Sequence, residues 1–182
     1  EAVAVLEEHI PPGAIVVCGA GHFWSWVNKG LTGRGGRTFL YCLGFGSIGQ
    51  ALPVAVGAAV GSPGRPVVVV DGDSSILMHV AELDTAARRG VDLLAFVLDD
   101  DAMGAELHKL RLRQVPDDAA LVPTPRLDLV ADGLGAHGVV VRDVEHLRAE
   151  LSARTEGGVH LVDAKVSRSV VDVSSVMGNE VR

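Results

Sequence analysis

The sequence predicts a doubly wound α/β fold, with a mainly parallel six-stranded sheet and helices on both of its faces. Short apolar runs alternate with amphipathic stretches along all 182 residues, which is the pattern of strands and helices in an α/β protein. The runs at 67–70 and 93–98 are apolar without interruption, as expected for strands that helices cover on both sides. Crossovers between parallel strands are expected to be right-handed.

Each element follows from this alternation. The strands are expected at residues 14–18, 38–43, 66–70, 93–98, 137–141 and 159–166. The helices are expected at residues 2–9, 24–31, 50–60, 77–89, 105–113, 127–134 and 144–153. Residues 115–125 form a loop that is long enough to act as a flap. The length fits one domain that spans residues 1–182.

Composition excludes several classes of function. The chain carries 16 basic and 23 acidic residues, and this net charge of −7 is a poor match for nucleic acid. No apolar run approaches the roughly 18 residues that a membrane-spanning helix needs, so no membrane partner is expected. Cys18 and Cys42 lie in apolar runs without metal-binding spacing, which favours reduced thiols and a cytoplasmic location.

Two acidic turns follow the two most apolar strands. Residues 71–75 read DGDSS, and residues 99–104 read DDDAMG. Ligands of open α/β sheets bind at the carboxyl ends of the strands, and adjacent strands would bring these turns together there. So many carboxylates repel one another unless a divalent cation such as Mg²⁺ neutralises them. The hydroxyls at positions 74 and 75 and the following helix amino terminus then offer donors to a phosphate carried with the metal.

Two glycine-rich turns follow two other expected strands. Residues 44–49 read GFGSIG and open the helix at 50–60, while residues 19–22 read GAGH. Glycines allow a ligand to come close to the backbone. Either turn alone is as typical of a tight strand-to-helix connection as of a cofactor pocket, and a histidine at position 22 is as compatible with a helix cap as with a ligand contact.

Taken together, the four turns resemble the diphosphate-binding (C-terminal, PP) domain of thiamine diphosphate-dependent enzymes of the pyruvate decarboxylase and acetohydroxyacid synthase group. Residues 72–78 (GDSSILM) resemble the Gly-Asp-Gly-Ser-Phe-Leu-Met of that family, and residues 99–104 resemble its Asn-Asn-x-x-Tyr-Gly. Asp73 and Asp100 lie 27 positions apart, which fits the family spacing. The likeness covers essentially the whole chain.

The resemblance implies a role for each matching residue. Mg²⁺ would be bound by the side chains of Asp73 and Asp100 and by the backbone carbonyl of Ala102. Ser74 and Ser75 would donate to the diphosphate, Ile48 would bend the cofactor as an apolar wedge, and the Gly46 carbonyl would accept from its 4′-amino group. Glu106 would handle protons on the substrate. The remaining cofactor contacts would come from Ala20, Gly21, His22, Ser47, Gly72, Met103 and Gly104.

Two residues depart from the family pattern. Ser74 stands where the family has the third glycine of its motif, and Asp100 stands where it has the metal-binding asparagine. The serine is tolerable if the backbone there is not left-handed. The additional carboxylate either tightens metal binding, requires a proton, or weakens binding of the diphosphate, so metal affinity is the inherited property most open to change.

The resemblance further implies an activity and a partner. The chain would be half of a decarboxylase or decarboxylating carboligase that acts on a small 2-oxo acid, and an acetohydroxyacid synthase-like carboligase is the alternative. In the family, the glutamate that activates the cofactor belongs to a separate pyrimidine-binding domain, which this chain does not contain. We therefore expect a pyrimidine-domain partner, either a separate subunit or the remainder of a longer chain, in a hetero-oligomer, dimer or tetramer.

Two readings from other classes remain open at this point. Residues 67–75 also resemble the strand and Asp-x-Asp-x-Ser of haloacid dehalogenase-like phosphatases, with Asp71 as nucleophile and Asp73 as acid or base. Such enzymes need a lysine before the second acidic pair, yet Arg88 and Arg89 are the only cationic side chains between Ser75 and Asp99. The third reading is a degenerate cofactor-binding module retained for assembly, which Ser74 and Asp100 would support.

Overall fold

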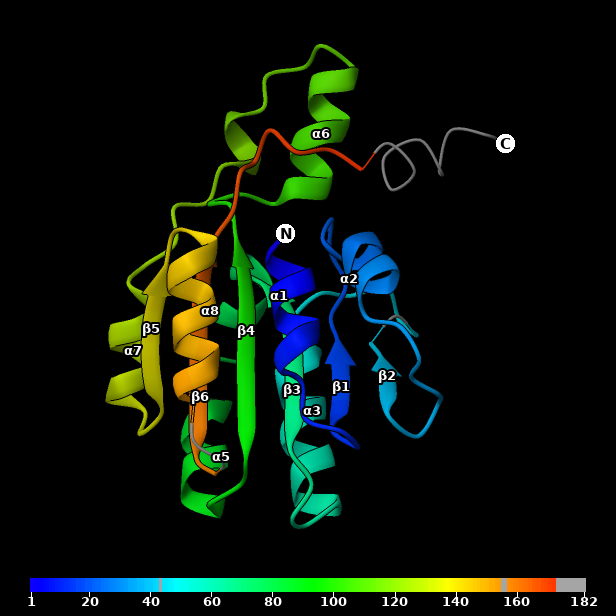
Figure 1. The fold of residues 1–182 in the computed structure, drawn as a ribbon. Helices are drawn as coiled ribbons and strands as arrows, with labels where there is room; N and C mark the ends of the chain where they lie inside the picture. Colours follow the sequence, from blue (N-terminus) through cyan, green and yellow to red (C-terminus); the bar gives the residue numbers. More distant parts are fainter. Residues whose placement is uncertain (43, 155–156, 173–182) are drawn as a thin grey trace.

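The computed structural model describes residues 1–42, 44–154 and 157–172 of the chain. In this part the strands form one six-stranded sheet in the order β2-β1-β3-β4-β6-β5, and every neighbouring pair is parallel (Figure 1). The strands are β1 (Ile15–Cys18), β2 (Phe39–Tyr41), β3 (Val67–Gly72), β4 (Leu93–Asp99), β5 (His137–Val141) and β6 (Val159–Lys165). The sheet confirms the predicted α/β fold, and it is parallel throughout.

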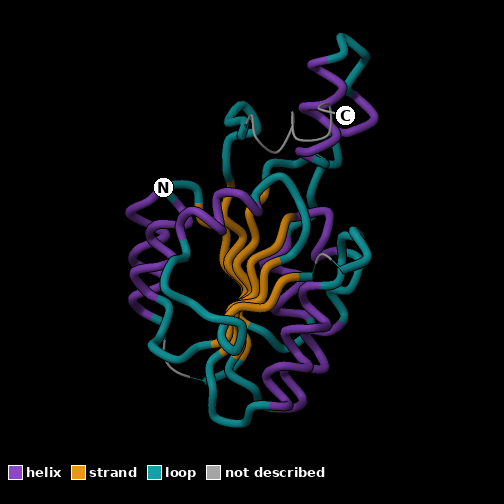
Figure 2. The backbone as a smooth tube through the Cα atoms, turned by 90° about the vertical axis from the view of Figure 1, so that its right-hand side faces the viewer, coloured by secondary structure: helices purple, strands orange, loops and turns teal. Residues whose placement is uncertain are grey.

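Helices cover both faces of the sheet (Figure 2). They are α1 (Ala2–His9), α2 (Trp24–Gly30), α3 (Ala51–Gly61), α4 (Asp73–Leu77), α5 (Glu82–Arg89), α6 (Gly104–Leu112), α7 (Leu127–Gly133) and α8 (Val144–Ala153), with a 3₁₀ turn η1 (Asp118–Ala120). Buried residues of α1, α2 and α8 pack on one face, and those of α3, α5 and α7 on the other. Within the described residues, no helix combines the length and apolarity needed to cross a bilayer.

The central strands are buried on both faces of the sheet. In β3 the side chains of Val68 and Val70 enter one core, and those of Val67 and Val69 enter the other. This alternation is the period of two of a strand. Because both faces of β3 and β4 are buried, an uninterrupted apolar run is the sequence that each strand requires.

The helix expected at 77–89 begins only at Glu82 in the structure, and a separate short helix, α4, precedes it. The chain becomes helical already at Asp73, directly after β3, and residues 78–81 form turns between α4 and α5. There the backbone makes tight three-residue hydrogen bonds, such as Met78 N–H to the Ser75 carbonyl at 3.2 Å and Glu82 N–H to the His79 carbonyl at 2.9 Å. No glycine or proline marks this break in the sequence, which is why the periodicity alone did not predict it.

The expected flap is anchored to the strand edge. Ala102 and Leu121 form an antiparallel bridge, in which the Met103 N–H donates to the Ala120 carbonyl at 2.8 Å and the Val122 N–H donates to the Asp101 carbonyl at 3.0 Å. Together with α6, this segment forms an arm that projects beyond the end of the sheet (Figure 1). The predicted strand at 38–43 is also shorter than expected, since β2 ends at Tyr41 and residue 43 lies outside the described residues.

Phe96 provides a test of the core. It lies in the middle of β4 and is fully buried. Phe96→Ala should lower the free energy of unfolding by about 3–5 kcal/mol, because it removes buried apolar surface and leaves a cavity. Urea unfolding followed by circular dichroism measures this loss. Leu129→Ala is the matched control, since this side chain is 58% exposed and its loss should stay within about 0.5 kcal/mol.

Candidate active site

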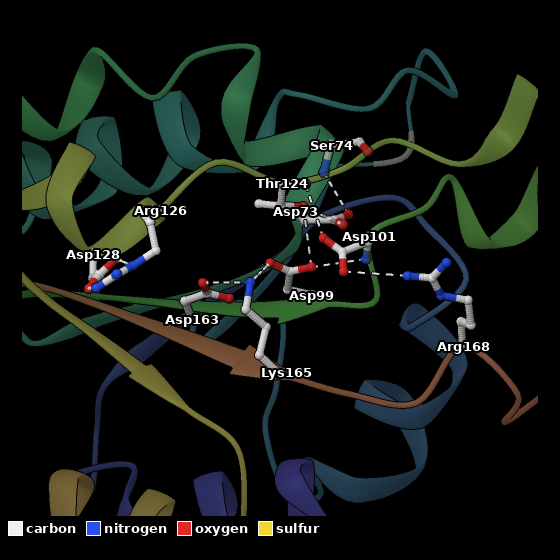
Figure 3. Close-up of polar contacts among 10 residues, drawn as sticks. All are labelled: Asp73, Ser74, Asp99, Asp101, Thr124, Arg126, Asp128, Asp163, Lys165 and Arg168. Atoms are coloured by element: carbon white, nitrogen blue, oxygen red, sulfur yellow. Dashed lines mark hydrogen bonds and ion pairs between the residues drawn. The ribbon is translucent and has the colours of Figure 1, made fainter.

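The acidic turns meet at the carboxyl edge of the sheet, as the sequence predicts. β3 and β4 are adjacent and in register, with Asp71 opposite Val97 and Gly72 opposite Leu98. The turns that follow them therefore emerge side by side, and Figure 3 shows carboxylates from both turns gathered at this point. Asp73 begins α4 and is buried, and Asp99 ends β4 and is also buried.

A threonine hydroxyl joins the two turns. Thr124 Oγ1 donates to Asp73 Oδ2 at 3.0 Å and lies 3.2 Å from Asp99 Oδ1, and the Thr124 N–H donates to Asp101 Oδ1 at 3.0 Å (Figure 3). Sequence reasoning missed this residue. The available signal is that Thr124 stands between Pro123 and Pro125, whose fixed φ angles hold a loop residue in an extended conformation.

Asp73 is costly to ionise in this setting. Its Oδ1 accepts from the Ser74 N–H at 2.7 Å, yet its pKa is raised to about 7, chiefly because burial disfavours the charged form and also because Asp99 is near. A cation at this carboxylate would offset both effects. Oxygen donors of this kind are the ligands that Mg²⁺ prefers.

Asp99 is held in its charged form by a lysine that the sequence analysis did not single out. Lys165 ends β6 and contacts the carboxylates of both Asp99 and Asp163 (Figure 3). Burial acts to raise the pKa of Asp99, but the hydrogen bonds from Lys165, the Asp101 N–H and Asp163 together outweigh it, so the pKa lies below its ordinary value. For Asp163 burial prevails and the pKa rises to about 6. Lys165 thus neutralises part of the charge at this edge.

Asp100 faces a different neighbour from Asp73. A Cβ atom added to Gly104 would lie 3.1 Å from Asp100 Oδ2 and 3.3 Å from His22 Cβ, so this carboxylate lies beside α6 and the turn after β1. Burial raises the pKa of Asp100. Among the described residues, hydrogen bonds connect Asp73 with Asp99 through Thr124, and none connects Asp73 with Asp100. No group of three or more His, Cys, Asp or Glu side chains in the described ranges is placed to hold a metal ion.

The predicted magnesium set therefore stays a prediction. It needs two carboxylates and one backbone carbonyl, that of Ala102. Ala102 is buried in its bridge to Leu121. The two hydrogen bonds of the bridge use the Asp101 carbonyl and the Met103 N–H, so neither of them involves the Ala102 carbonyl.

The two serines of the DGDSS turn have different surroundings. The Ser74 hydroxyl is buried and has no hydrogen-bond partner in the described part of the chain. The Ser75 hydroxyl accepts from the Gly49 N–H at 2.8 Å. A buried hydroxyl without a partner loses hydrogen bonds to water and gains none, so Ser74 is left with an unmet requirement that an oxygen-rich ligand would meet. α4 has only five residues, so its amino terminus adds little to this.

The glycine turns are closely packed. A Cβ on Gly21 would lie 2.5 Å from the Phe23 ring, and one on Gly72 would lie 3.3 Å from the same ring, so Phe23 packs against both turns. In the turn at 44–49, Gly46 and Gly49 have positive φ angles of 70° and 87°. Gly46 is exposed, Ser47 and Ile48 are half-buried, and Gly49 is buried, so the turn descends from solvent to the α4 surface.

The histidines and Glu106 lie on opposite sides of α6. His108 is buried, its ring centroid lies 4.5 Å from that of His22, and its Nε2 has no partner among the described residues. His22 Nε2 accepts from the Asp172 N–H at 3.2 Å. Glu106 is 57% exposed and lies 3.7 Å from the Lys109 ammonium. The catalytic role predicted for Glu106 thus stays a prediction, and its side chain is solvated in this chain.

This fold and site define a class of protein. An open parallel α/β sheet that gathers glycine turns, a buried carboxylate and, among the described residues, an unpaired hydroxyl at its carboxyl edge has the architecture of a domain that binds its ligand at that edge. Comparison with known proteins specifies the ligand. Residues 19–164 match the family model described as thiamine pyrophosphate enzyme, C-terminal TPP binding domain.

Similar proteins agree with that match. The chain is 29% identical over 169 residues to the putative acetolactate synthase large subunit IlvB2 of Mycobacterium tuberculosis, covering 93% of this chain and 29% of the relative. It is 38% identical over 103 residues to the probable acetolactate synthase 2 of Oryza sativa, covering 57% of this chain and 16% of the relative. The chain thus spans less than a third of the length of these relatives.

Solved structures show the same fold. Benzoylformate decarboxylase from Polynucleobacter necessarius superposes with a TM-score of 0.83 at 21% identity, covering 94% of this chain and 33% of the other. A putative thiamin diphosphate-dependent enzyme from Mycobacterium smegmatis gives a TM-score of 0.76 at 25% identity, covering 91% and 31%. The chain belongs to the thiamine pyrophosphate enzyme family, as one of its C-terminal TPP-binding domains.

The phosphatase alternative does not fit the structure. Its nucleophile would be Asp71, which is fully buried. A Cβ added to Gly19 would lie 2.3 Å from Asp71 Oδ1, so the backbone of the turn after β1 covers this carboxylate. A nucleophile must reach its substrate, and Asp71 does not.

The buried Asp71 predicts a pH dependence of stability. Burial raises its pKa to about 7. A carboxyl whose pKa is higher in the folded than in the unfolded chain stabilises the fold at low pH, and this contribution is lost as the pH rises through about 7.

Asp71→Asn removes that titration. Relative to the wild type, the variant should gain on the order of 2 kcal/mol in unfolding free energy between pH 5 and pH 8. Urea unfolding of both proteins at the two pH values measures the change. Parallel pH profiles for variant and wild type would contradict the assignment.

Proposed function

We propose that this chain is the diphosphate- and Mg²⁺-binding half of a thiamine diphosphate-dependent 2-oxo acid decarboxylase or decarboxylating carboligase, active only with a pyrimidine-domain partner. The observation that supports this best is the pairing of Asp73 with Ser74 at the sheet edge. One is a buried carboxylate that ionises at a cost, and the other is a buried hydroxyl without a partner. A metal-bound diphosphate supplies what both lack.

Two sets of residues in this chain would bind the two ends of the cofactor. At the diphosphate end, we assign Asp73, Asp100 and the Ala102 carbonyl to Mg²⁺, and the Ser74 hydroxyl and the Gly72 backbone to the diphosphate. Asp99 is not needed as a ligand because Lys165 already neutralises it. Met103 and Gly104 complete the turn on the α6 side.

At the pyrimidine end, we assign the turns at 19–22 and 44–49. Ile48 provides the apolar surface against which the cofactor bends, and the Gly46 carbonyl accepts from the amino group. When bound, thiamine diphosphate supplies a thiazolium ring that takes up the electrons released when a 2-oxo acid loses its carboxylate. Glu106 handles substrate protons only in the assembled enzyme, since in this chain it is solvated.

A partner surface lies next to the 44–49 turn. Phe45, in this turn, is 95% exposed, and Met78, which packs against Gly49, is 52% exposed. Gathered apolar side chains at the surface mark interaction sites in proteins. We propose that the pyrimidine-binding domain or subunit covers this region and brings its activating glutamate to the cofactor.

Three named relatives favour a second candidate. The sequence relatives are described as acetolactate synthases, including the catalytic subunit of Saccharomyces cerevisiae at 29% identity over 90% of this chain. An acetohydroxyacid synthase-like carboligase is therefore the alternative. The two activities share the cofactor and this domain, and the products formed from a 2-oxo acid distinguish them.

Cofactor binding tests the proposal directly. Titration calorimetry with thiamine diphosphate should show saturable binding that requires Mg²⁺. Asp73→Asn should weaken it at least tenfold, because the amide cannot supply the negative charge that the metal needs. Glu106→Gln is the control and should bind as the wild type does. Wild-type protein that binds no cofactor in the presence of its partner would overturn the proposal.

Activity tests the need for a partner. The purified chain should release no CO₂ from 2-oxo acids, and addition of a protein that carries the pyrimidine-binding domain should restore turnover. A coupled assay over a panel of small 2-oxo acids measures this and separates aldehyde products from acetohydroxy acids. Full turnover by the isolated chain would contradict the partner requirement.

A further inference from the structure

The turn after β4 carries more negative charge than the family pattern provides. Asp99, Asp100 and Asp101 follow one another, and the first two stand where the pattern has neutral asparagines. We assigned Asp100 to Mg²⁺, and this metal would carry a diphosphate that is itself an anion. Each additional carboxylate attracts the metal but repels the diphosphate. The turn therefore requires positive charge beside it.

Two cations from one short segment face this turn. Lys165 ends β6 and contacts Asp99, and Arg168 follows three positions later. Arg168 Nη2 lies 3.4 Å from Asp101 Oδ2, and Figure 3 shows its guanidinium directed at that carboxylate. The end of β6 thus brings two positive charges to the turn after β4.

Arg168 also shares a cavity with Asp100. The cavity has a volume of about 310 Å³, and its lining includes all three carboxylates of the turn together with Lys165 and Arg168. Burial raises the pKa of Asp100, and the positive charge of Arg168 acts against this rise. The guanidinium is therefore close enough to stabilise the negative charge of Asp100.

The chain holds Arg168 between two points of attachment. At the first, the Val166 N–H donates to the carbonyl of the last β4 residue at 2.8 Å. At the second, the Asp172 N–H donates to His22 Nε2 at 3.2 Å, and the Asp172 side chain is buried. Residues 166–172 therefore run from β6 to the turn after β1 with both ends fixed, and Arg168 lies between these ends.

We propose that Arg168 is a positioning residue for the metal-bound diphosphate: together with Lys165, it offsets the negative charge of the 99–101 turn, so that the turn binds Mg²⁺ and still accepts an anion. Arg168 acts through Asp100 and Asp101 and does not contact the cofactor. The segment after β6 thereby becomes part of the cofactor site, a role that no sequence motif indicated. This inference rests on the proposed function.

Variants of Arg168 separate its charge from its shape. Calorimetry on the full chain measures binding of thiamine diphosphate in the presence of Mg²⁺. Arg168→Gln should weaken binding about tenfold, because an uncompensated carboxylate then faces the diphosphate. Arg168→Lys keeps the charge and should stay within about threefold of the wild type. Arg142 is exposed and lines the same cavity, so Arg142→Gln is the matched control and should also stay within about threefold.

Asp100→Asn tests whether the two residues act through each other. This variant restores the neutral residue of the family pattern, so Arg168 has less charge to offset. In the Asp100→Asn background, Arg168→Gln should weaken binding by no more than about twofold. An equal loss in both backgrounds would mean that Arg168 contacts the diphosphate itself, and this result would overturn the inference.

The metal without cofactor should respond in the opposite direction. Mn²⁺ takes the same oxygen ligands as Mg²⁺, and its electron paramagnetic resonance signal measures how much of it is free. Arg168→Gln should bind Mn²⁺ about threefold more tightly than the wild type, because a competing cation is removed. A residue that only supports the fold would weaken Mn²⁺ and thiamine diphosphate alike. That result, or an unchanged Mn²⁺ affinity, contradicts the inference.

The two probes separate this inference from the proposed function. If the wild type binds Mn²⁺ but no thiamine diphosphate with its partner present, the proposed function fails, and the Mn²⁺ affinity of Arg168→Gln still decides whether Arg168 offsets the charge of the turn. If the wild type binds both and Arg168→Gln does not weaken thiamine diphosphate, the inference alone is wrong. A wild type that binds neither probe overturns both. Weaker thiamine diphosphate together with tighter Mn²⁺ supports the inference.

Discussion

The carboxyl edge of this sheet depends on one interaction, the hydrogen bonding of a single threonine hydroxyl to two buried carboxylates. Thr124 hydrogen-bonds to both Asp73 and Asp99, which repel one another whenever both are ionised. Two parallel strands force these residues to the same edge, so the fold itself creates the repulsion. Thr124, from a distant loop, and Lys165, from β6, reduce this repulsion. A cation would stabilise the negative charge that they leave uncompensated.

The acidic residues at this edge thus differ in how the protein compensates their charge. Asp99 is held in its charged form by the Lys165 ammonium, and Asp71 is enclosed by the turn after β1. Asp73 has neither arrangement, since its contacts are a threonine hydroxyl and a backbone N–H. In a parallel sheet of this type, the carboxylate with the fewest cationic partners is the one that an external cation would stabilise most.

The sequence predicted the sheet, its helices and the meeting of the acidic turns, because these follow from local periodicity and from the rule that parallel strands share an edge. Thr124 and Lys165 could not be found this way. Thr124 reaches Asp73 across 51 positions and Lys165 reaches Asp99 across 66, and no local pattern encodes contacts at such separations. The division between α4 and α5 was missed for the opposite reason, since its tight turns leave no mark in residue type.

The bridge between Ala102 and Leu121 has a consequence for how the protein tolerates change. It closes the base of the arm formed by α6 and η1, so the intervening chain is a loop with fixed ends. Insertions at the outer end of the arm, around Val115 and Pro116, would lengthen the loop without moving its base. That end is therefore a suitable attachment point for a fluorophore or an affinity peptide, at a distance from the chemistry at the sheet edge.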